Sequence, residues 1–426
     1  MKLFQQMLVA TASLGLIAPI AAQASDVINL EGMNDYNRSK KSSSKRFDSK
    51  TFVNEVNEDL AILKGRVDGL EAKQNNFEAG SFSDTTTMDG KAIFTVQSVD
   101  TDDNVAASYH GQVHAAYTYQ LNLNTSFNGD DNLYVRLKSG NHDGPSDKKT
   151  VYNTYLSSGS GKSDAMTVDK IWYTLPIGER NTVFLGPKVE NYYMHGTTPS
   201  IYKPVLKSFT LGGNAAAYGA DTSPGAGWKY EADNGFAISS NFTTQDGNTS
   251  SGMLTNEGPT SWATQVGYTQ PRYSVSAIVN MKYNNWVDEY FQSSAGSARG
   301  GDGNSTNIGL RGWWRPESTG TATPSISAGY DTSETDNTGD SNTTAYFVGL
   351  NWQDIFNADD RIGIAVGQPQ KLENDTVDPF LYEIYYSYRV NDSTTITPAF
   401  FGGTSKNSAN KEVDMTGFVV ETQFNF

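Results

Sequence analysis

The sequence predicts an all-β transmembrane barrel of about sixteen antiparallel strands, preceded by a short N-terminal coiled-coil helix. Three observations predict it: an export signal at the start, many segments of alternating polarity, and connections that alternate between short and long. The composition agrees. Hydrophobic residues make up only 37% of the 426, yet there are 23 Tyr, 20 Phe and 40 Gly. This aromatic content excludes a disordered chain and fits many short strands joined by turns.

The first 24 residues read as a secretory signal peptide. Lys2 precedes an apolar run over residues 7–20, and "AQA" ends at Ala24. Cleavage would leave Ser25 as the new N-terminus. The run is shorter than the roughly 18 apolar residues that a membrane span needs. We therefore expect export into a Gram-negative-type envelope, where the absence of Cys means that disulfides play no part.

Residues 25–50 form a polar segment that we expect in the periplasm. It carries the basic run "RSKKSSSKR" at residues 38–46. A solvated linker is the simpler interpretation, and contact with an anionic cell-wall polymer is the alternative.

Residues 51–80 are predicted to form a coiled coil. Apolar residues repeat at spacings of three and four, which is a heptad seam, at Val53, Val56, Leu60, Leu63, Val67, Leu70 and Phe77. So short a helix is unstable alone, and Gly65 and Gly69 weaken it further. We expect the seam to bind other copies of the chain; packing of a single helix on its own domain is the alternative.

From residue 90 to 426 the period changes to two, which predicts the barrel. One example alternates apolar Tyr273, Val275, Ala277, Val279, Met281 and Tyr283 with polar Ser274, Ser276, Asn280 and Lys282. Each such segment has about ten residues, the length of a tilted membrane-spanning strand. Tyr and Trp near the ends of the apolar faces are typical of an interfacial girdle.

The connections between these segments sort by length. Short turns are expected near residues 127–132, 176–181, 233–235, 270–272, 317–322, 356–360 and 391–394. Long polar loops are expected near residues 99–109, 140–167, 189–225, 245–260, 285–305, 332–343, 368–379 and 404–414. Short periplasmic turns and long outer loops are typical of outer-membrane barrels, whereas a soluble β-sandwich has no reason for this sorting. Both termini then lie on the short-turn side.

The polar face of each strand should line a water-filled lumen, because charges facing lipid are costly. This assigns a set of cations to the pore wall: Arg136, Lys138, Lys170, Lys188, Lys229, Arg311, Arg315 and Arg389. The inward acids are fewer, namely Glu231, Glu383 and Glu421. A basic wall would concentrate anions. The alternative is that these cations pair with loop carboxylates and set no selectivity.

The third long loop, residues 190–225, is too long and too rich in Tyr for a solvated connection. We expect it to fold into the lumen and narrow the pore, with these residues facing the wall cations: Glu190, Tyr192, Tyr193, His195, Tyr202, Lys203 and Lys207. The competing interpretation is that "SFTLGGNAAAYGA" adds two strands to the barrel.

No catalytic, cofactor or metal site is predicted. "GSGKS" at residues 159–163 resembles a phosphate loop, but Leu156 stands where that motif needs glycine. His110 and His114 would be about 13 Å apart along a strand, too far to share a metal ion. The net charge of −15 excludes nucleic acid as a partner.

The chain ends as a patterned strand, "GFVVETQFNF". Phe424 and Phe426 should face lipid while Glu421, Gln423 and Asn425 face water. Closure against the first strand leaves no free edge. We expect the terminal aromatic residue to be the signal that the outer-membrane assembly machinery reads.

The segment "LAILKGRVDGLEAKQNNFEAGSFSDTTTMDGKAIF" at residues 60–94, followed by the barrel, resembles the cyanobacterial outer-membrane porins, which are related to the OprB-type carbohydrate-selective porins. The junction "TTTMDGKAIF" is the more specific match. The resemblance implies a sixteen-stranded barrel, a homotrimer, and passive uptake of inorganic ions and small hydrophilic nutrients, carbohydrates included. Such porins usually carry a surface-layer-homology domain before the coiled coil, and residues 25–50 are too few to form it. The strand sequences also show no distinctive row of lumenal aromatic side chains on which a sugar could stack.

These features together predict an outer-membrane diffusion porin, with lipid, two further copies of the chain and the assembly machinery as partners. The alternative from another class is a structural or surface-receptor barrel that tethers envelope layers and transports little. We do not expect an enzyme.

Overall fold

The computed structural model describes residues 85–102, 111–143, 153–213, 216–219, 222–286, 303–336, 342–373, 375–406 and 411–426, and the single residues 64, 67 and 83. The signal peptide, the polar segment and nearly all of the coiled coil lie outside them and stay predictions. No helix in the described part of the chain is long and apolar enough to cross a membrane.

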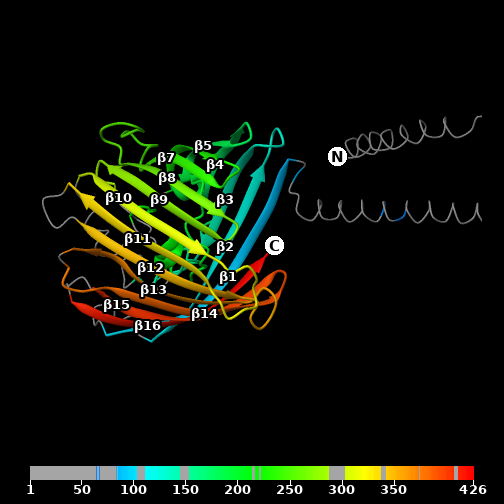
Figure 1. Cartoon of the computed structure of the whole chain (residues 1–426), viewed down its shortest axis with the longest axis vertical. Helices are drawn as coiled ribbons and strands as arrows, with labels where there is room; N and C mark the ends of the chain where they lie inside the picture. Colours follow the sequence, from blue (N-terminus) through cyan, green and yellow to red (C-terminus); the bar gives the residue numbers. More distant parts are fainter. Residues whose placement is uncertain are drawn as a thin grey trace, which may run out of the picture. The chain divides into compact units, whose positions relative to one another are not determined.

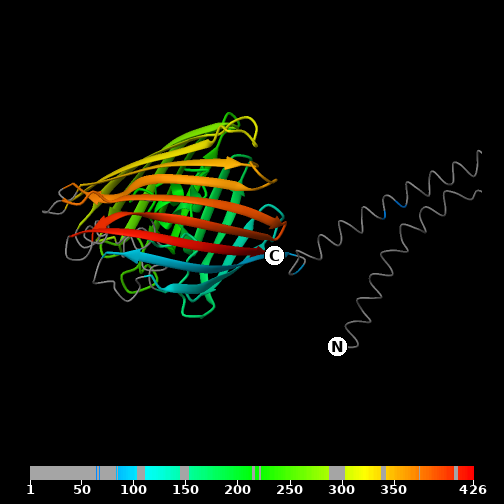
Figure 2. The ribbon, with the colours of Figure 1, turned by 90° about the horizontal axis from the view of Figure 1, so that it is seen from below.

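The sixteen strands form a closed barrel in which every strand pairs with its neighbours in sequence, and β1 closes on β16 (Figures 1 and 2). The prediction of sixteen antiparallel strands is confirmed. The first eight are β1 (Thr86–Thr101), β2 (Val113–Thr125), β3 (Asn132–Gly140), β4 (Thr167–Ile177), β5 (Asn181–Glu190), β6 (Thr222–Glu231), β7 (Phe236–Thr244) and β8 (Thr260–Gln270). The second eight are β9 (Tyr273–Tyr283), β10 (Ser305–Trp314), β11 (Ser325–Thr335), β12 (Thr343–Gln353), β13 (Arg361–Leu372), β14 (Phe380–Asn391), β15 (Thr394–Lys406) and β16 (Glu412–Asn425).

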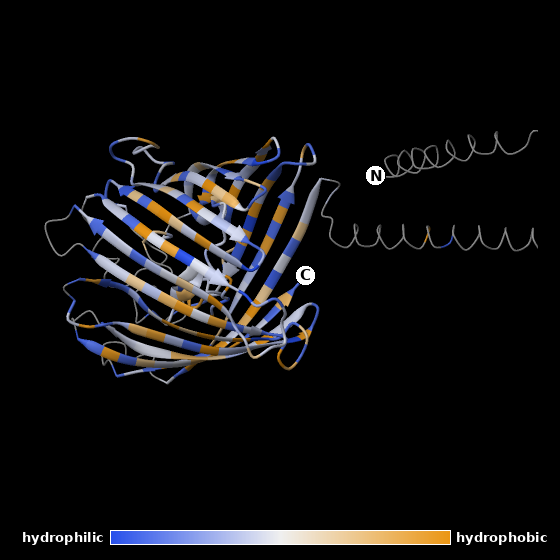
Figure 3. Cartoon of the chain, viewed as in Figure 1, coloured by the Kyte–Doolittle hydropathy of each residue, from blue (hydrophilic) through white to orange (hydrophobic). Residues whose placement is uncertain are grey.

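The two-residue period fixes which face of each strand is outside. In β9, residues alternate between exposed and buried from Tyr273 to Tyr283 without interruption. Apolar side chains stand outward, with Val275 57% exposed, while Asn280 is fully buried against the interior. Figure 3 shows the same alternation of colours along the neighbouring strands. An apolar exterior on a strand with a polar interior is the pattern that a lipid environment requires.

The short turns lie where the sequence predicts them. In the structure they span residues 126–131, 178–180, 232–235, 271–272, 315–324, 354–360 and 392–393. Five long loops also agree. The last three do not, because the strands continue further and leave only 336–342, 373–379 and 407–411. Asp331, which directly precedes the loop expected near 332–343, therefore lies well within β11.

The chain closes the barrel with its last strand. Asn425 of β16 is opposite Lys91 of β1, and Phe426 exchanges two backbone hydrogen bonds with Gly90, at 2.7 and 3.0 Å. The Phe426 ring stacks on Tyr119 of β2 with the ring centroids 5.8 Å apart. A Cβ atom on Gly90 would lie 2.5 Å from that ring, so the ring occupies the space that a side chain there would need.

Two long connections pack inside the barrel. We call residues 191–221 the lumenal loop and residues 141–166 the companion loop. The lumenal loop contains two short 3-10 helices, η3 (Asn191–Met194) and η4 (Lys207–Gly212). The competing interpretation, in which "SFTLGGNAAAYGA" adds strands, is wrong: its described residues hold η4, with Leu211 at a positive φ of 55°, and no strand.

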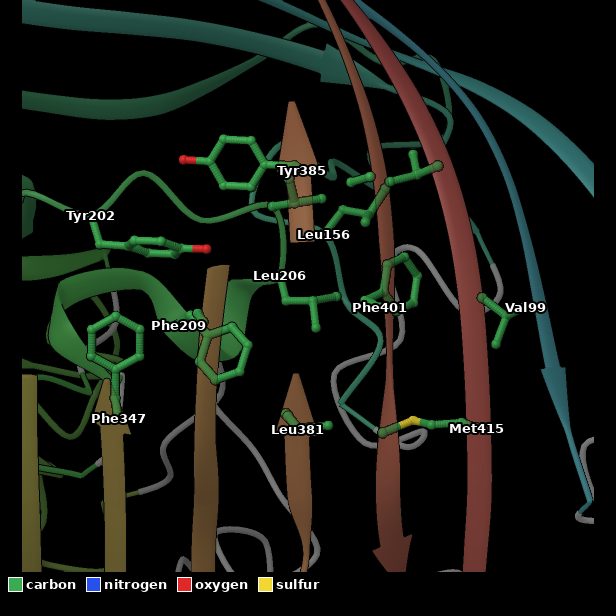
Figure 4. Packing of buried hydrophobic residues seen from close by; sticks show 14 of the residues in the cluster. Val99, Leu156, Tyr202, Leu206, Phe209, Phe347, Leu381, Tyr385, Phe401 and Met415 are labelled. Carbon is green, nitrogen blue, oxygen red and sulfur yellow. The ribbon is translucent and has the colours of Figure 1, made fainter. Parts of the chain in front are cut away.

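An apolar cluster holds both loops against one side of the interior (Figure 4). It joins side chains of the lumenal loop, the companion loop and the inner faces of β1 and β12–β16: Tyr202, Val205, Leu206, Phe209, Leu156, Val99, Phe347, Ala365, Leu381, Tyr385, Ala399, Phe401, Val413, Met415 and Val419. Burial of so many apolar side chains stabilises a loop that the chain could not otherwise hold in place.

Candidate functional site

The lumenal loop follows the inner wall, fixed by side chains of successive strands. Gln265 of β8 accepts from the Thr197 amide at 3.0 Å. The Trp313 indole of β10 donates to the Thr198 carbonyl at 3.0 Å, and Ser327 of β11 accepts from the Ile201 amide at 3.2 Å. Because each bond comes from a different strand, the path of the loop is specified along its length.

Glu383 on β14 is the next contact and the most extensive one. Its carboxylate accepts the Tyr202 hydroxyl at 2.8 Å and the backbone amides of Val205 and Leu206 at 3.1 and 2.7 Å. Glu383 is 1% exposed. A buried carboxylate is stable only with such donors, and an ionised acceptor makes each hydrogen bond stronger.

Arg311 on β10 holds the returning part of the lumenal loop. Its guanidinium pairs with Asp331 of β11 at 2.7 Å and donates to the Leu211 carbonyl at 2.8 Å. It also lies 4.7 Å from the centre of the Tyr218 ring. Asp331 was not among the inward acids expected from the sequence, because the strand was expected to end beside it. Arg311 is thus a structural cation that Asp331 neutralises.

The companion loop pairs with the lumenal loop. Leu156 and Leu206 form an isolated antiparallel bridge. Ser157 donates its amide to the Val205 carbonyl at 2.7 Å and its hydroxyl to the Pro204 carbonyl at 2.8 Å. Two connections far apart in sequence therefore form one layer inside the barrel.

An aromatic cluster lies inside the barrel beside β3 and β4. Trp172 lies 4.6 Å from Tyr134 and 5.0 Å from Tyr193, and Tyr192 stacks on Tyr193 at 4.9 Å between ring centres. Arg136 donates to the Tyr193 hydroxyl at 3.0 Å. The sequence predicted no aromatic series in the lumen, because these rings come from three separate segments. Tyr193 is 37% exposed and is the ring of this cluster most open to a solute.

The other predicted loop residues have varied surroundings. Glu190, at the end of β5, pairs with Lys170 of β4. His195 is buried with its Nδ1 3.2 Å from the Ser239 hydroxyl, and this burial lowers the pKa of His195 to about 3. Burial, followed by the nearby Glu383, raises the pKa of the Tyr202 hydroxyl. Lys207 donates its backbone amide to Tyr155 at 2.8 Å.

Two predicted wall cations lie elsewhere. A β-bulge between Gly186 and Val189 shifts the alternation of β5. Val189 is consequently the buried residue, and Lys188 is exposed and donates to the Val168 carbonyl at 2.9 Å. Arg315 follows the end of β10 and donates to the Pro271 carbonyl at 2.6 Å in the adjacent turn. The assignments of Lys188 and Arg315 to the wall are corrected accordingly.

The predicted cations that do face inward are largely neutralised. Lys229 pairs with Glu231 at 2.7 Å, and Arg389 pairs with Asp359 and, at 3.1 Å, with Asp392. The alternative interpretation, in which loop carboxylates pair with the wall cations, describes Arg389, whose two partners lie in turns; the partner of Lys229 is on its own strand. Arg136 differs in that its hydrogen-bond partners are neutral: it donates to the Asn122 amide oxygen at 3.1 Å and to the Tyr193 hydroxyl. Lys138 lies in β3 opposite Gln120.

The described residues contain no group of three or more His, Asp or Glu side chains arranged to hold a metal ion. A cavity of about 600 Å³ does open between the lumenal loop and the wall, and it is lined mainly by charged and hydroxyl side chains. Such a lining suits the passage or binding of polar solutes.

Comparisons with known proteins agree with this architecture. The family model "Carbohydrate-selective porin, OprB family" matches residues 48–424. The uncharacterized protein alr4550 of Nostoc sp. is 32% identical over 174 residues, covering 38% of this chain and 28% of that protein. The uncharacterized protein sll0772 of Synechocystis sp. is 28% identical over 137 residues, covering 32% of this chain and 25% of that protein. The match thus spans only about a quarter of either relative's length.

Among solved structures, OprB of Pseudomonas putida at high pH superposes with a TM-score of 0.60 at 10% identity, covering 84% of this chain and 97% of that one. A loop L8 deletion mutant of OmpT, an outer membrane protein of Vibrio cholerae, gives a TM-score of 0.51 at 11% identity, covering 80% and 99%. At these identities the likeness concerns the fold.

Proposed function

The chain belongs to the carbohydrate-selective porin, OprB family. From that premise we propose that it is a passive diffusion channel for inorganic ions and small hydrophilic solutes, and that the lumenal loop narrows its pore. The observation that carries the proposal is this loop inside a closed barrel, bonded to inward side chains from β8 to β14. A loop fixed in this way leaves a reduced, polar passage beside it. Conduction needs no covalent chemistry.

Planar-bilayer recording on the purified full chain tests the proposal. We expect stepwise current increments in KCl as single barrels insert. A folded barrel, verified by a heat-sensitive shift in gel mobility, that inserts without current would contradict it. That result would favour the alternative, a structural or surface-receptor barrel.

Sugars are a second class of solute, favoured by the aromatic cluster. The exposed face of Tyr193 with Arg136 beside it offers a stacking surface next to a hydrogen-bond donor. Liposome swelling in glucose and maltose tests this. We expect Tyr193→Ala to slow swelling in both sugars and Tyr193→Phe to retain the wild-type rate; equal rates for all three proteins would exclude the cluster from sugar passage.

We further propose a homotrimer whose contacts include the coiled coil at residues 51–80. The support is the heptad seam and the family resemblance. Chemical crosslinking of the full chain and of a chain lacking residues 51–80 tests it. A trimer band that survives the deletion would place the contacts in the barrel alone, and a monomer in both would reject the assembly.

A further inference from the structure

The cavity of about 600 Å³ contains cations that the sequence did not single out. Lys91 reaches it from β1, Arg361 from β13 and Lys203 from the lumenal loop. Lys203 lies within electrostatic range of both Lys91 and Arg361. Three cations from three segments therefore meet around one water-accessible space.

The position of Lys203 is built by its neighbours. Tyr202 is bonded to Glu383 on one side, and Val205 to both Glu383 and Ser157 on the other. Within residues 199–210, Lys203 is the one exposed side chain. Lys203 lines the cavity together with Pro204 and Val205, and it is the charged side chain that this stretch of the loop contributes.

Four acids also line the cavity; two of them pair with a cation and two are held by hydrogen bonds. Asp359 and Asp392 bind Arg389, and Asp354 accepts the Asp359 amide at 2.6 Å. Glu421, the acid within electrostatic range of Lys91, accepts the Ser158 hydroxyl.

In the described part of the chain, Lys91, Lys203 and Arg361 make no ion pair with a carboxylate; Glu421 interacts with Lys91 at longer range, and Tyr385 interacts with Arg361. Arg136 and Lys138 add to the positive field around Lys91. Repulsion among these cations would be relieved by an anion between them.

We propose that Lys91, Lys203 and Arg361 form a binding station for a small inorganic oxyanion on its way through the pore. The inference rests on the proposed diffusion channel. Burial, and then Arg361, lower the pKa of Lys203, as expected for a partly buried cation beside another cation. The hydroxyls of Ser387 and Thr395 also line the cavity and can donate to oxyanion oxygens, while Thr397 donates to Ser387 at 3.0 Å.

An oxyanion fits the lining better than a sugar does. The single aromatic residue at the cavity is Tyr385, which is 4% exposed and so offers no ring face for stacking. The volume also leaves an anion several of its waters, since each occupies about 30 Å³. Binding in such a wet site is weak enough for release, which conduction requires.

Inorganic phosphate is the probe for the first experiment, in which the full chain conducts KCl in a planar bilayer at pH 7. We expect phosphate to reduce the chloride current in the wild type. In Lys203→Gln and Arg361→Gln the phosphate effect should weaken, and the chloride-to-potassium permeability ratio should fall by about twofold to fivefold. Lys203→Arg should restore both.

Lys229→Gln is the matched control, because it removes the same charge from another inward lysine outside the cavity. It should keep the phosphate effect. Equal phosphate effects in the wild type and all variants, or an equal loss in the control, would overturn the binding station while leaving the channel intact.

Phosphorus-31 NMR line broadening on the refolded protein measures phosphate binding without any current. Broadening that Lys203→Gln removes, in a protein that does not conduct, would keep the binding station and overturn the channel. No broadening in the wild type would overturn the station.

Discussion

Tyr202 of the lumenal loop donates its hydroxyl to Glu383 on the inner face of β14 at 2.8 Å. The two residues are 181 positions apart in the chain. Because the same carboxylate also accepts two backbone amides, it joins the tip of the loop to the wall at three points.

The first prediction concerns this contact. Glu383→Gln removes the charge and replaces one acceptor oxygen with a donor, so we expect the loop to lose about 1–3 kcal/mol of stabilisation. Single-channel recording should show a larger and noisier current. Tyr202→Phe, which removes one bond of the three, should show a smaller effect. Glu373→Gln, an exposed carboxylate in the connection after β13, should conduct like the wild type; currents from Glu383→Gln that match it would contradict the anchoring role.

A repeated turn provides the second prediction. "FNGDD" at residues 127–131 and "FNADD" at residues 356–360 share a pattern that sequence reasoning passed over. In each turn, the last Asp accepts three hydrogen bonds from residues of the same turn. It also accepts a hydrogen bond from a tyrosine of a nearby strand: Asp131 from Tyr173 of β4 at 2.7 Å, and Asp360 from Tyr386 of β14 at 3.0 Å.

Replacing Asp131 by Ala should lower the thermal unfolding temperature, because three turn donors and Tyr173 lose their acceptor. Asp130→Ala is the control, since the neighbouring side chain has no such role. Burial raises the pKa of Asp131, but hydrogen bonds from Tyr173 and the turn outweigh it and hold that pKa below its usual 3.8. Its contribution is therefore present above pH 3.8 and is lost as the pH falls through the lower folded value. Equal melting temperatures for both variants would contradict the role.

The third prediction concerns the chain end. Deleting Phe426 removes two backbone bonds to Gly90 and the stacking on Tyr119. We expect a lower yield of folded barrel in the outer membrane, with more chain left in the periplasm, as measured by membrane fractionation. Phe426→Tyr keeps an aromatic ring and should insert normally. An unchanged membrane yield after deletion would refute the prediction.

The fourth prediction concerns pH. His195 has a folded pKa of about 3, against 6.5 in an exposed histidine. Below pH 6.5 the unfolded chain binds a proton that the folded chain does not, so stability is complete above 6.5 and falls by about 1.4 kcal/mol per pH unit towards 3.

Urea unfolding between pH 7 and pH 4 measures this slope. His195→Gln should flatten it, although His142, whose pKa burial lowers to about 4, continues to contribute in the variant. Identical slopes for the wild type and His195→Gln would show that His195 does not couple folding to pH.

The sequence by itself determined the barrel. A two-residue period assigns each side chain to lipid or lumen from local spacing alone, as β9 illustrates from Tyr273 to Tyr283. Turn chemistry is also local, so the short connections and the strand count followed from the sequence. Where local spacing was interrupted, the prediction was wrong: the bulge beside Val189 moved Lys188 out of the wall.

The tertiary structure decided what fills the lumen. Glu383 binds Tyr202, Asp331 neutralises Arg311, and Trp172 meets Tyr193, each across long stretches of sequence. Such contacts depend on which strands lie opposite one another once the barrel has closed, and no periodicity encodes them. The physical reason is that alternation specifies which side a residue faces, whereas hydrogen bonds and packing between distant segments specify what it meets there.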